Sequence, residues 1–353
     1  MDFCFATHDD AAGILKIMEE DTAPGGLKLL YTRRSDPCAS FISESGDSVA
    51  GVIKRSGEVI ATIAAIPRSM YINGSKRRVC YVTNMKRLKG IDTAINWYEA
   101  FDKMCKKVNC DSYFCSLITG NDDVSRMLHK KRRFMPYAER LAAYRTYIIN
   151  PKVRIKAGPA GTEFVKAAAD DESGIVSFLN ENGRKKNLFP AFDRLSDLGD
   201  LKAEDFYLLK RDERIVAAGA VWNRSKVKQY VLKKCTGIYS FLRRLNPLIS
   251  KLGYITFPQD NEEADFAFIS FLLAQNDEAD LYRYFLSRLC DAAADRSMLV
   301  IGTDLNNAKH RVLKSIRSVS FDSELNEIIM TNIDGREPER FDGGNIELEC
   351  ALL

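Results

Sequence analysis

The sequence predicts an α+β protein made of two similar halves. Two observations support this prediction. Three pairs of segments recur in the same order along the chain, and each copy mixes short apolar runs with segments of helical periodicity. The 353 residues suffice for two domains of ordinary size, and 46% hydrophobic with 28% charged residues is typical of a globular protein.

The first two repeated pairs open each half. Residues 3–21 align with residues 164–182, and each segment predicts a short strand followed by an amphipathic helix with an aspartate cap. Residues 53–65 align with residues 209–221, and each predicts a strand, a tight polar turn and a second strand.

The third pair extends over a longer stretch. Residues 93–128 and 278–313 align without a gap and place Asn121 on Asn306. Each copy predicts a helix, an apolar strand (113–118 or 298–303) and a second helix that begins near the asparagine. Three pairs in one order indicate a duplication of the whole unit.

A proline- and glycine-containing segment, residues 150–161, separates the two copies. We therefore expect domains at residues 1–150 and 151–353. Two parts of the second domain have no counterpart in the first. Residues 236–252 predict either a helix that covers the sheet or a lid with Arg243 and Arg244 facing an acidic ligand. Residues 346–353 predict a last strand.

The chain is organised around a strand, a corner and a helix. An apolar run ends at Asn84, a basic corner follows at residues 86–90, and apolar residues recur at helical spacing from Ala94 to Val108. A helix that begins at such a corner leaves backbone N–H groups unpaired, which suits an anion such as phosphate. Arg87 and Lys89 add positive charge, and Gly90 allows the backbone to approach a ligand.

Arg87-x-x-Gly90 resembles the pyrophosphate-binding loop of the GNAT superfamily, the acyl-CoA-dependent N-acyltransferases. Their pattern is Gln/Arg-x-x-Gly-x-Gly/Ala, and Asp92 stands here at its last position. A carboxylate near a phosphate costs about 1 kcal/mol or more. The order of elements in each half is also similar to the GNAT fold. The resemblance implies two tandem GNAT-like domains in three layers, each a mixed, mostly antiparallel sheet flanked by helices, whose fourth and fifth strands splay apart to admit CoA.

The resemblance further implies an N-acyltransferase that moves an acyl group from acyl-CoA, most simply acetyl-CoA, to the amine of a small molecule or a peptide. Arg87, Gly90 and Asp92 align with Leu272, Gln275 and Asp277, so we expect the first domain to bind acyl-CoA and the second to shape the acceptor site or stabilise the fold. The expected cofactor-binding residues are Met85, Lys86, Arg87, Leu88, Lys89, Gly90, Ile91, Asp92 and Asn121.

The resemblance also implies catalytic positions. A backbone N–H at Asn84 or Met85 would polarise the thioester carbonyl. Counting back from Phe134 places His129 where the family has a tyrosine acid, although it also fits a surface residue. Glu20, at the end of the first helix, is the expected general base, with a solvated surface carboxylate as the alternative. A non-catalytic CoA-binding or sensing module is the alternative function.

The composition argues against three other classes of function: nucleic-acid binding, membrane insertion and metal binding. The net charge of +4 is small, which argues against a nucleic-acid surface. The longest apolar run, residues 59–66, is too short to span a membrane, so we expect no membrane partner. The three histidines lie far apart in the sequence, so we expect no metal site. Nine scattered cysteines without a CxxC pair predict reduced thiols in a cytoplasmic protein.

Overall fold

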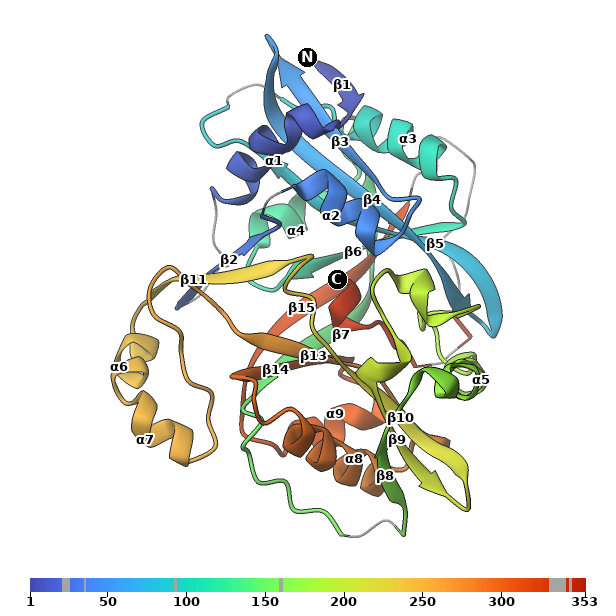
Figure 1. Cartoon of the computed structure of the whole chain (residues 1–353). Helices are drawn as coiled ribbons and strands as arrows, with labels where there is room; N and C mark the ends of the chain where they lie inside the picture. The colour runs from blue at the N-terminus through green and yellow to red at the C-terminus, as the bar shows by residue number, and fades with distance from the viewer. Residues whose placement is uncertain (21–25, 35, 92–93, 159–160, 330–340, 343–344) are drawn as a thin grey trace.

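The computed structural model describes residues 1–20, 26–34, 36–91, 94–158, 161–329, 341–342 and 345–353. Within these ranges strands and helices follow one another in nearly the same order in the two halves (Figure 1). The predicted α+β architecture is therefore confirmed. The described ranges contain no helix that is long and apolar enough to cross a lipid bilayer.

The first half begins with a strand and a helix and ends with a long strand. Its elements are β1 (Asp2–Phe5), α1 (Ala11–Met18), β2 (Leu27–Thr32), α2 (Pro37–Glu44), β3 (Val49–Arg55), β4 (Glu58–Ile72), β5 (Ser75–Arg87), α3 (Trp97–Val108), β6 (Ser112–Ile118), α4 (Asp122–Leu128) and β7 (Tyr137–Ile149).

The second half follows a similar order, but it has no equivalent of β2 and α2 after its first helix and adds two short strands and two helices after its hairpin. Its elements are β8 (Glu163–Lys166), α5 (Glu172–Gly183), β9 (Phe206–Arg211), β10 (Arg214–Trp222), β11 (Gln229–Cys235), α6 (Ile238–Arg244), α7 (Asn246–Lys251), β12 (Glu262–Glu263), β13 (Phe266–Ala274), α8 (Ala279–Ala292), β14 (Met298–Asp304), α9 (Ala308–Leu313), β15 (Ser318–Ile329) and the 3-10 helix η6 (Cys350–Leu352).

The duplication extends to individual contacts. Asp10 accepts a hydrogen bond from the backbone N–H of Thr7 and pairs with Lys54 at 2.6 Å. In the second half Asp171 accepts from the backbone N–H of Ala168 and pairs with Lys210 at 3.3 Å. Both aspartates fix the start of the first helix and tie it to the neighbouring strand, so the copies share their local geometry.

One continuous sheet runs through both halves. In the described part of the chain it has twelve strands in the order β1-β3-β4-β5-β6-β15-β7-β14-β13-β10-β9-β8. Neighbouring strands are antiparallel except for the pairs β5–β6 and β13–β14, which are parallel. A separate three-stranded sheet, β12-β11-β2, joins a strand of the first half to two strands of the second.

The last strands of the two halves are exchanged at the centre of the large sheet. Strand β15 of the second half pairs with both β6 and β7, and β7 of the first half pairs with both β15 and β14. The expected boundary near residue 150 therefore follows directly on a strand that is hydrogen-bonded to the second half.

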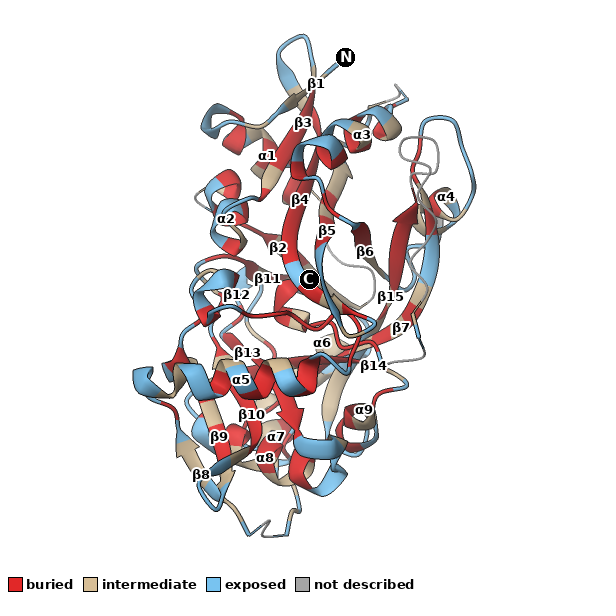
Figure 2. Ribbon diagram, turned by 90° about the vertical axis from the view of Figure 1, so that its right-hand side faces the viewer, coloured by how far each residue is buried: buried red, intermediate tan, exposed pale blue. Residues whose placement is uncertain are grey.

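Helices cover both faces of the sheet, as a three-layer arrangement requires (Figure 2). In the first half α1 and α2 bury one apolar cluster, and α3 and α4 bury another on the opposite face. In the second half α5 lies on one face while α8 and α9 lie on the other.

Most predicted elements are confirmed, and three details are corrected. The hairpins and the strands β6 and β14 form where the repeats place them. Helix α3, however, begins at Trp97 rather than at the corner, because the Asn96 side chain accepts from the backbone N–H of Glu99 and caps it there. The tail forms no last strand: it makes a single bridge at Ile346 and then η6. The asparagine that caps α9 is Asn307, one residue after the aligned position.

Candidate active site

The first half contains a point where two parallel strands separate. Strands β5 and β6 pair only at Val79, Cys80 and Tyr81 of β5, and both strands then continue without pairing to each other. We call the region between residues 82–87 of β5 and residues 115–118 of β6 the first divergence. It lies at the centre of the first half, between the layer of α1 and α2 and the layer of α3 and α4 (Figure 1).

A β-bulge at Asn84 accompanies the separation. Asn84 has φ of +54°, and the register between β4 and β5 shifts between Thr62 and Ala64. A bulge takes one residue out of the ladder and turns its backbone groups aside. The Asn84 side chain is buried, its Nδ2 lies 3.4 Å from Thr62 Oγ1, and its Oδ1 has no hydrogen-bond partner among the described residues. Asn84 therefore carries an unsatisfied acceptor beside a freed stretch of backbone.

Tyr81 and Ser116 meet at the start of the first divergence. The Tyr81 hydroxyl lies 2.7 Å from Ser116 Oγ, and the two residues stand on the opposite strands β5 and β6. Burial raises the pKa of Tyr81, and the hydrogen bond to Ser116 opposes this effect only in part. Tyr81 is therefore a protonated hydroxyl at neutral pH, at the point where the strands begin to separate.

The corner after β5 holds most of the expected cofactor-binding residues. The backbone N–H of Leu88 donates to Ile60 O at 2.8 Å, and that of Lys89 donates to Glu20 Oε2 at 2.7 Å. Gly90 has φ of +73°, and an added Cβ there would contact nothing within 4 Å. Glu20 therefore lies at the corner, where its carboxylate accepts a hydrogen bond from the backbone N–H of Lys89, one of the groups expected to face a phosphate.

The remaining residues of the corner are placed as follows. Met85 and Ile91 are half-buried against the cluster under α3, the Lys86 amine lies 3.3 Å from Met18 O, and the exposed Arg87 reaches Ile91 O at 3.4 Å. Asp92 lies outside the described residues. The prediction that a helix begins at this corner is wrong, because α3 begins seven residues after Gly90. The positive end of the α3 dipole therefore does not contribute at the corner.

Asn121 and His129 lie beyond β6, on the other wall of the first divergence. Asn121 precedes α4 and is exposed, and His129 ends that helix. His129 Nε2 lies 2.9 Å from Asn326 Oδ1, and Nδ1 lies 3.3 Å from Ser125 Oγ. Since Asn326 Nδ2 donates to Glu324 O, its Oδ1 accepts the proton of Nε2. Both ring nitrogens are therefore engaged.

The second half has a divergence of the same design. Strands β13 and β14 pair at three positions and separate, and Phe271 has φ of +54°, like Asn84. When the two bulges are aligned, Gly90 matches Asp277 and not the predicted Gln275. The alignment of the bulged strands is shifted by two residues from the alignment of the helices that follow them. Asp277 also has positive φ, and it accepts from the Lys186 amine and the Tyr282 hydroxyl, each at 2.7 Å.

The C-terminal segment, residues 345–353, occupies this second divergence. Helix η6 contacts both β13 and β14, and Tyr144 Oη donates to Leu348 O at 2.8 Å. Burial raises the pKa of Glu349 to about 7, opposed by the charge of Lys309 and by the backbone N–H of Phe271 that faces its carboxyl. The bulge of the second half therefore faces a side chain of the same protein.

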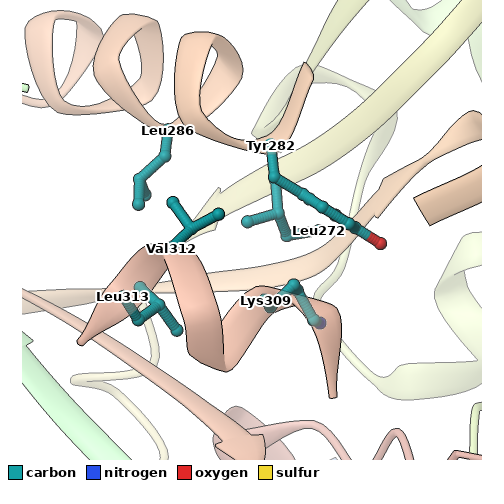
Figure 3. Close-up of a pocket in the computed structure, with 6 residues that line it drawn as sticks. All are labelled: Leu272, Tyr282, Leu286, Lys309, Val312 and Leu313. Carbon is teal, nitrogen blue, oxygen red and sulfur yellow. The ribbon is translucent and has the colours of Figure 1, made fainter. Parts of the chain in front are cut away.

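A small space of about 160 Å³ remains beside this segment, between α8, α9 and β13 (Figure 3). That volume includes space open to solvent, and the space between the side chains has no room for a water molecule. Lys309, which lines it, is bound to the carboxylate of Glu347. This space therefore does not fit a nucleotide-sized ligand. The residues that line it are Leu272, Tyr282, Leu286, Lys309, Val312 and Leu313.

Buried charges join the two halves. Glu44 of α2 accepts from Arg33 and from Arg68 Nη2 at 2.5 Å, and Arg224 Nη2 of the second half lies 3.3 Å away. The Lys228 amine, also buried, donates to Leu353 O at 2.7 Å. Burial alone would raise the pKa of Glu44, but Arg33, Lys228 and Arg68 hold it well below its usual value. We call these five residues the buried charge cluster.

Sequence reasoning missed Ser116, the Glu349 segment and the buried charge cluster. The cluster assembles from four separate parts of the chain, and no local pattern connects them. A local signal did exist for the start of α3, since Asn96-x-x-Glu99 has the form of a helix cap. The bulge residue Asn84 was identified, but its conformation was not.

Comparison with solved structures gives the same architecture. A GCN5-related N-acetyltransferase from Anabaena variabilis matches with a TM-score of 0.52 and 9% identity, over 92% of this chain and 72% of that chain. Saccharomyces cerevisiae N-myristoyltransferase with bound myristoyl-CoA matches with a TM-score of 0.56 and 8% identity, over 93% and 82%. A probable N-acyltransferase from Enterococcus faecalis matches with a TM-score of 0.50 and 7% identity, over 93% and 72%.

No family model and no curated protein sequence matches the chain. At identities below 10% the structural likeness shows the fold alone. The pair of parallel strands that splay apart, found in both halves, is the feature that the sequence resemblance predicts, whereas the bulge at that point is not predicted. The chain therefore has the GNAT fold in two tandem copies, which confirms its predicted resemblance to the GNAT superfamily at the level of the fold.

Proposed function

We propose that this protein is an acyl-CoA-dependent N-acyltransferase that binds the acyl donor in the first divergence. The observation that supports this best is the separation of β5 and β6 at the Asn84 bulge. The second divergence holds residues 345–353, so one donor binds to each chain. Acetyl-CoA is the simplest donor. The donor class is supported by the similarity to a solved N-myristoyltransferase that has myristoyl-CoA bound.

Residues 85–91 and Asn121 are the proposed contacts of the donor. Arg87 is exposed and Lys89 lies at the same corner, so both provide cations for the phosphates. The positive φ of Gly90 and the open space around it leave the backbone accessible. Asp92 completes the proposed set from sequence alone.

The reaction breaks the thioester C–S bond and forms an amide C–N bond. The amine loses a proton, and the leaving thiolate gains one. A backbone N–H at Asn84 or Met85 donates to the carbonyl oxygen, on which negative charge develops. The bulge supports this assignment because it releases backbone groups from the ladder beside the place where the strands separate.

Glu20 is the proposed base and His129 the proposed acid. His129 can act as the acid only when both ring nitrogens carry a proton, with Nδ1–H donating to Ser125 Oγ, and it can pass the Nε2 proton to the thiolate only after its hydrogen bond to Asn326 breaks. Glu20 accepts from the Lys89 N–H, so a diphosphate at the corner would compete with its carboxylate. These two roles of Glu20 predict different kinetics.

Two substitutions separate the roles of Glu20 in an assay of free thiol release from acetyl-CoA with a pool of amines. If Glu20 is the general base, Glu20→Gln should lower kcat by about 100-fold or more while KM for the donor changes little. If the Glu20 carboxylate instead competes with the diphosphate of the donor, Glu20→Ala should lower KM for the donor at constant kcat. Glu58→Gln, in an exposed hairpin turn, is the matched control and should behave like the wild type.

The alternative function is a CoA-binding or sensing module without turnover. It is favoured by one observation: the N–H of Lys89 and both nitrogens of His129 are already engaged. Binding of CoA without thiol release for any amine in the pool would support this function. Thiol release that depends on both amine and donor would exclude it.

A further inference from the structure

The insertion formed by α6 and α7 has no counterpart in the first half. It follows β11, projects to one side of the molecule and returns toward β12 through an irregular segment (Figure 1). Residues 236–254 therefore do not belong to the duplicated fold. An added segment of this kind is a candidate for a function that the common fold lacks.

Apolar side chains lie on both sides of this insertion. The inner side packs on the core of the second half through Tyr239, Leu242 and Leu245, with Ile249 buried. On the outer side Ile238 is 68% exposed and Phe241 is 61% exposed. The large apolar side chains of this outer side are exposed to solvent and do not pack on the core. They are Ile238, Phe241, Leu248, Leu252 and Tyr254.

The exposed apolar residues are concentrated here. Elsewhere in the described residues, large exposed apolar side chains occur in ones and twos, such as Ile42 on α2, and Ile118 with Phe321 on the paired strands β6 and β15. Scattered exposure of this kind is ordinary, whereas a contiguous group marks an interaction surface.

The charge of the same segment has one sign. Residues 236–254 contain three basic residues and no acidic residue. Arg244 and Lys251 are exposed and have no acidic partner in the described part of the chain, while Arg243 is paired with Asp260. Arg317 adds a cation over the Tyr254 ring at 5.7 Å and donates to Leu252 O. Cations thus surround the outer apolar side chains.

We propose that the outer side of α6 and α7 docks on the surface of an anionic lipid bilayer. Short amphipathic segments with exposed apolar residues and flanking Lys and Arg bind in the interfacial region of such bilayers. The apolar side chains enter the acyl boundary, and the basic groups contact the phosphates of the lipid head groups. The sequence argued against a membrane partner only because no segment spans a bilayer, and docking at the surface requires no span.

The pattern of charge favours a lipid surface over a protein partner. A protein surface presents charges of both signs, and a complementary interface normally includes acidic residues for the partner's cations. Residues 236–254 offer none, and Asp260, the next acidic residue along the chain, is paired with Arg243. A lipid surface is uniformly anionic and needs only cations around an apolar centre.

Vesicle flotation tests the proposal with the full chain. The probes are vesicles of phosphatidylcholine alone and of phosphatidylcholine with 30% phosphatidylglycerol, at about 0.1 M and 0.5 M salt. We expect the protein to float with the anionic vesicles at low salt, and to float much less with neutral vesicles or at high salt.

Two variants and one control locate the surface. Phe241→Glu with Leu248→Glu removes the apolar contact, and Arg244→Glu with Lys251→Glu removes the cations. Each pair should weaken binding by at least about tenfold. Ile42→Glu makes the same change at a residue of equal exposure on α2, and it should bind like the wild type. All changed side chains are exposed, so circular dichroism should show an unchanged fold.

Failure to float with anionic vesicles would overturn the proposal. So would equal binding by the wild type and both variants, or concentration-dependent dimerisation that Phe241→Glu with Leu248→Glu abolishes, since that identifies a second copy as the partner. None of these outcomes bears on acyl transfer, which is measured separately by thiol release.

Discussion

Asn84 and Phe271 occupy the same place in the two copies and show how the copies have diverged. Both have φ near +54° at a bulge where parallel strands separate. Asn84 is beside a divergence with an unsatisfied polar acceptor, whereas Phe271 faces the buried carboxyl of Glu349. The same backbone geometry therefore serves a proposed donor site in one half and internal packing in the other.

Gly90 provides the first prediction at the residue scale. Its φ of +73° disfavours any side chain, while an added Cβ meets nothing within 4 Å. Gly90→Ala should therefore destabilise the protein by about 1 kcal/mol through backbone strain alone. Gly46→Ala is the control, because that glycine also has open space but no positive φ. Urea denaturation measures both, and equal stability of the two variants would contradict the prediction.

Glu44 provides the second prediction. It is the buried carboxylate that faces three arginines, so Glu44→Gln leaves Arg33 and Arg68 without a carboxylate partner and Arg224 with Asp200 alone. The free energy of unfolding should fall by about 3–5 kcal/mol. Asp47→Asn removes an exposed partner of Arg78, and its effect should stay below about 1 kcal/mol.

The pKa of Glu44 also gives the pH dependence a sign. Because its pKa is lower in the folded than in the unfolded state, its contribution to stability is present above pH 4.5 and is lost as the pH falls below that value. The wild type should lose stability on acidification more steeply than Glu44→Gln does. Parallel pH profiles of the two proteins would contradict this account.

At the scale of elements, the C-terminal segment occupies the second divergence. Glu349 has a pKa of about 7 there, against an ordinary value of 4.5. A raised carboxyl pKa costs stability as the pH rises from 4.5 through 7. At pH 8 the cost is roughly 3 kcal/mol.

Glu349→Gln should therefore stabilise the protein at pH 8 and change it little near pH 4.5, since the amide keeps the shape and lacks the charge. Glu347→Gln is the opposite case, because that residue pairs with the buried Lys309 and its loss should destabilise. Thermal unfolding at both pH values measures these effects. A destabilised Glu349→Gln at pH 8 would contradict the assigned burial of the charge.

The predictions from sequence were most accurate for elements with local signals. The hairpins have tight polar turns between apolar runs, and the sequence places them correctly. The basic corner predicts too early a start for α3, since the residue that caps the helix is Asn96. The apolar pattern of the tail predicts a strand, but the tail is held by side chains from distant parts of the chain, such as Tyr144, which no local pattern reveals.

At the scale of the whole molecule, exchange of β7 and β15 makes each half depend on the other. The buried charge cluster adds a second connection, since Glu44 comes from the first half and Arg224 from the second. Neither feature could be predicted from the sequence, because both depend on contacts between residues that are far apart along the chain. The duplication predicts two similar units, but not that they share one sheet.

This sharing predicts that the halves unfold together. The chain has two tryptophans, and they report on different halves: Trp97 on α3 and Trp222 at the end of β10. In the single-tryptophan variants Trp222→Phe and Trp97→Phe, the fluorescence and far-ultraviolet circular dichroism transitions in urea should share one midpoint. A fluorescence transition that precedes the loss of secondary structure in either variant would show that the halves unfold separately.

Calorimetric titration with acetyl-CoA and myristoyl-CoA tests the proposed donor site most directly. Wild type, Arg87→Glu and Arg77→Glu are compared, because both arginines are exposed on β5 but only Arg87 lies at the corner. The account predicts one equivalent of donor per chain, unchanged binding by Arg77→Glu, and binding weakened by about tenfold or more in Arg87→Glu. Absence of binding by the wild type, or equal affinity of all three proteins, would contradict it.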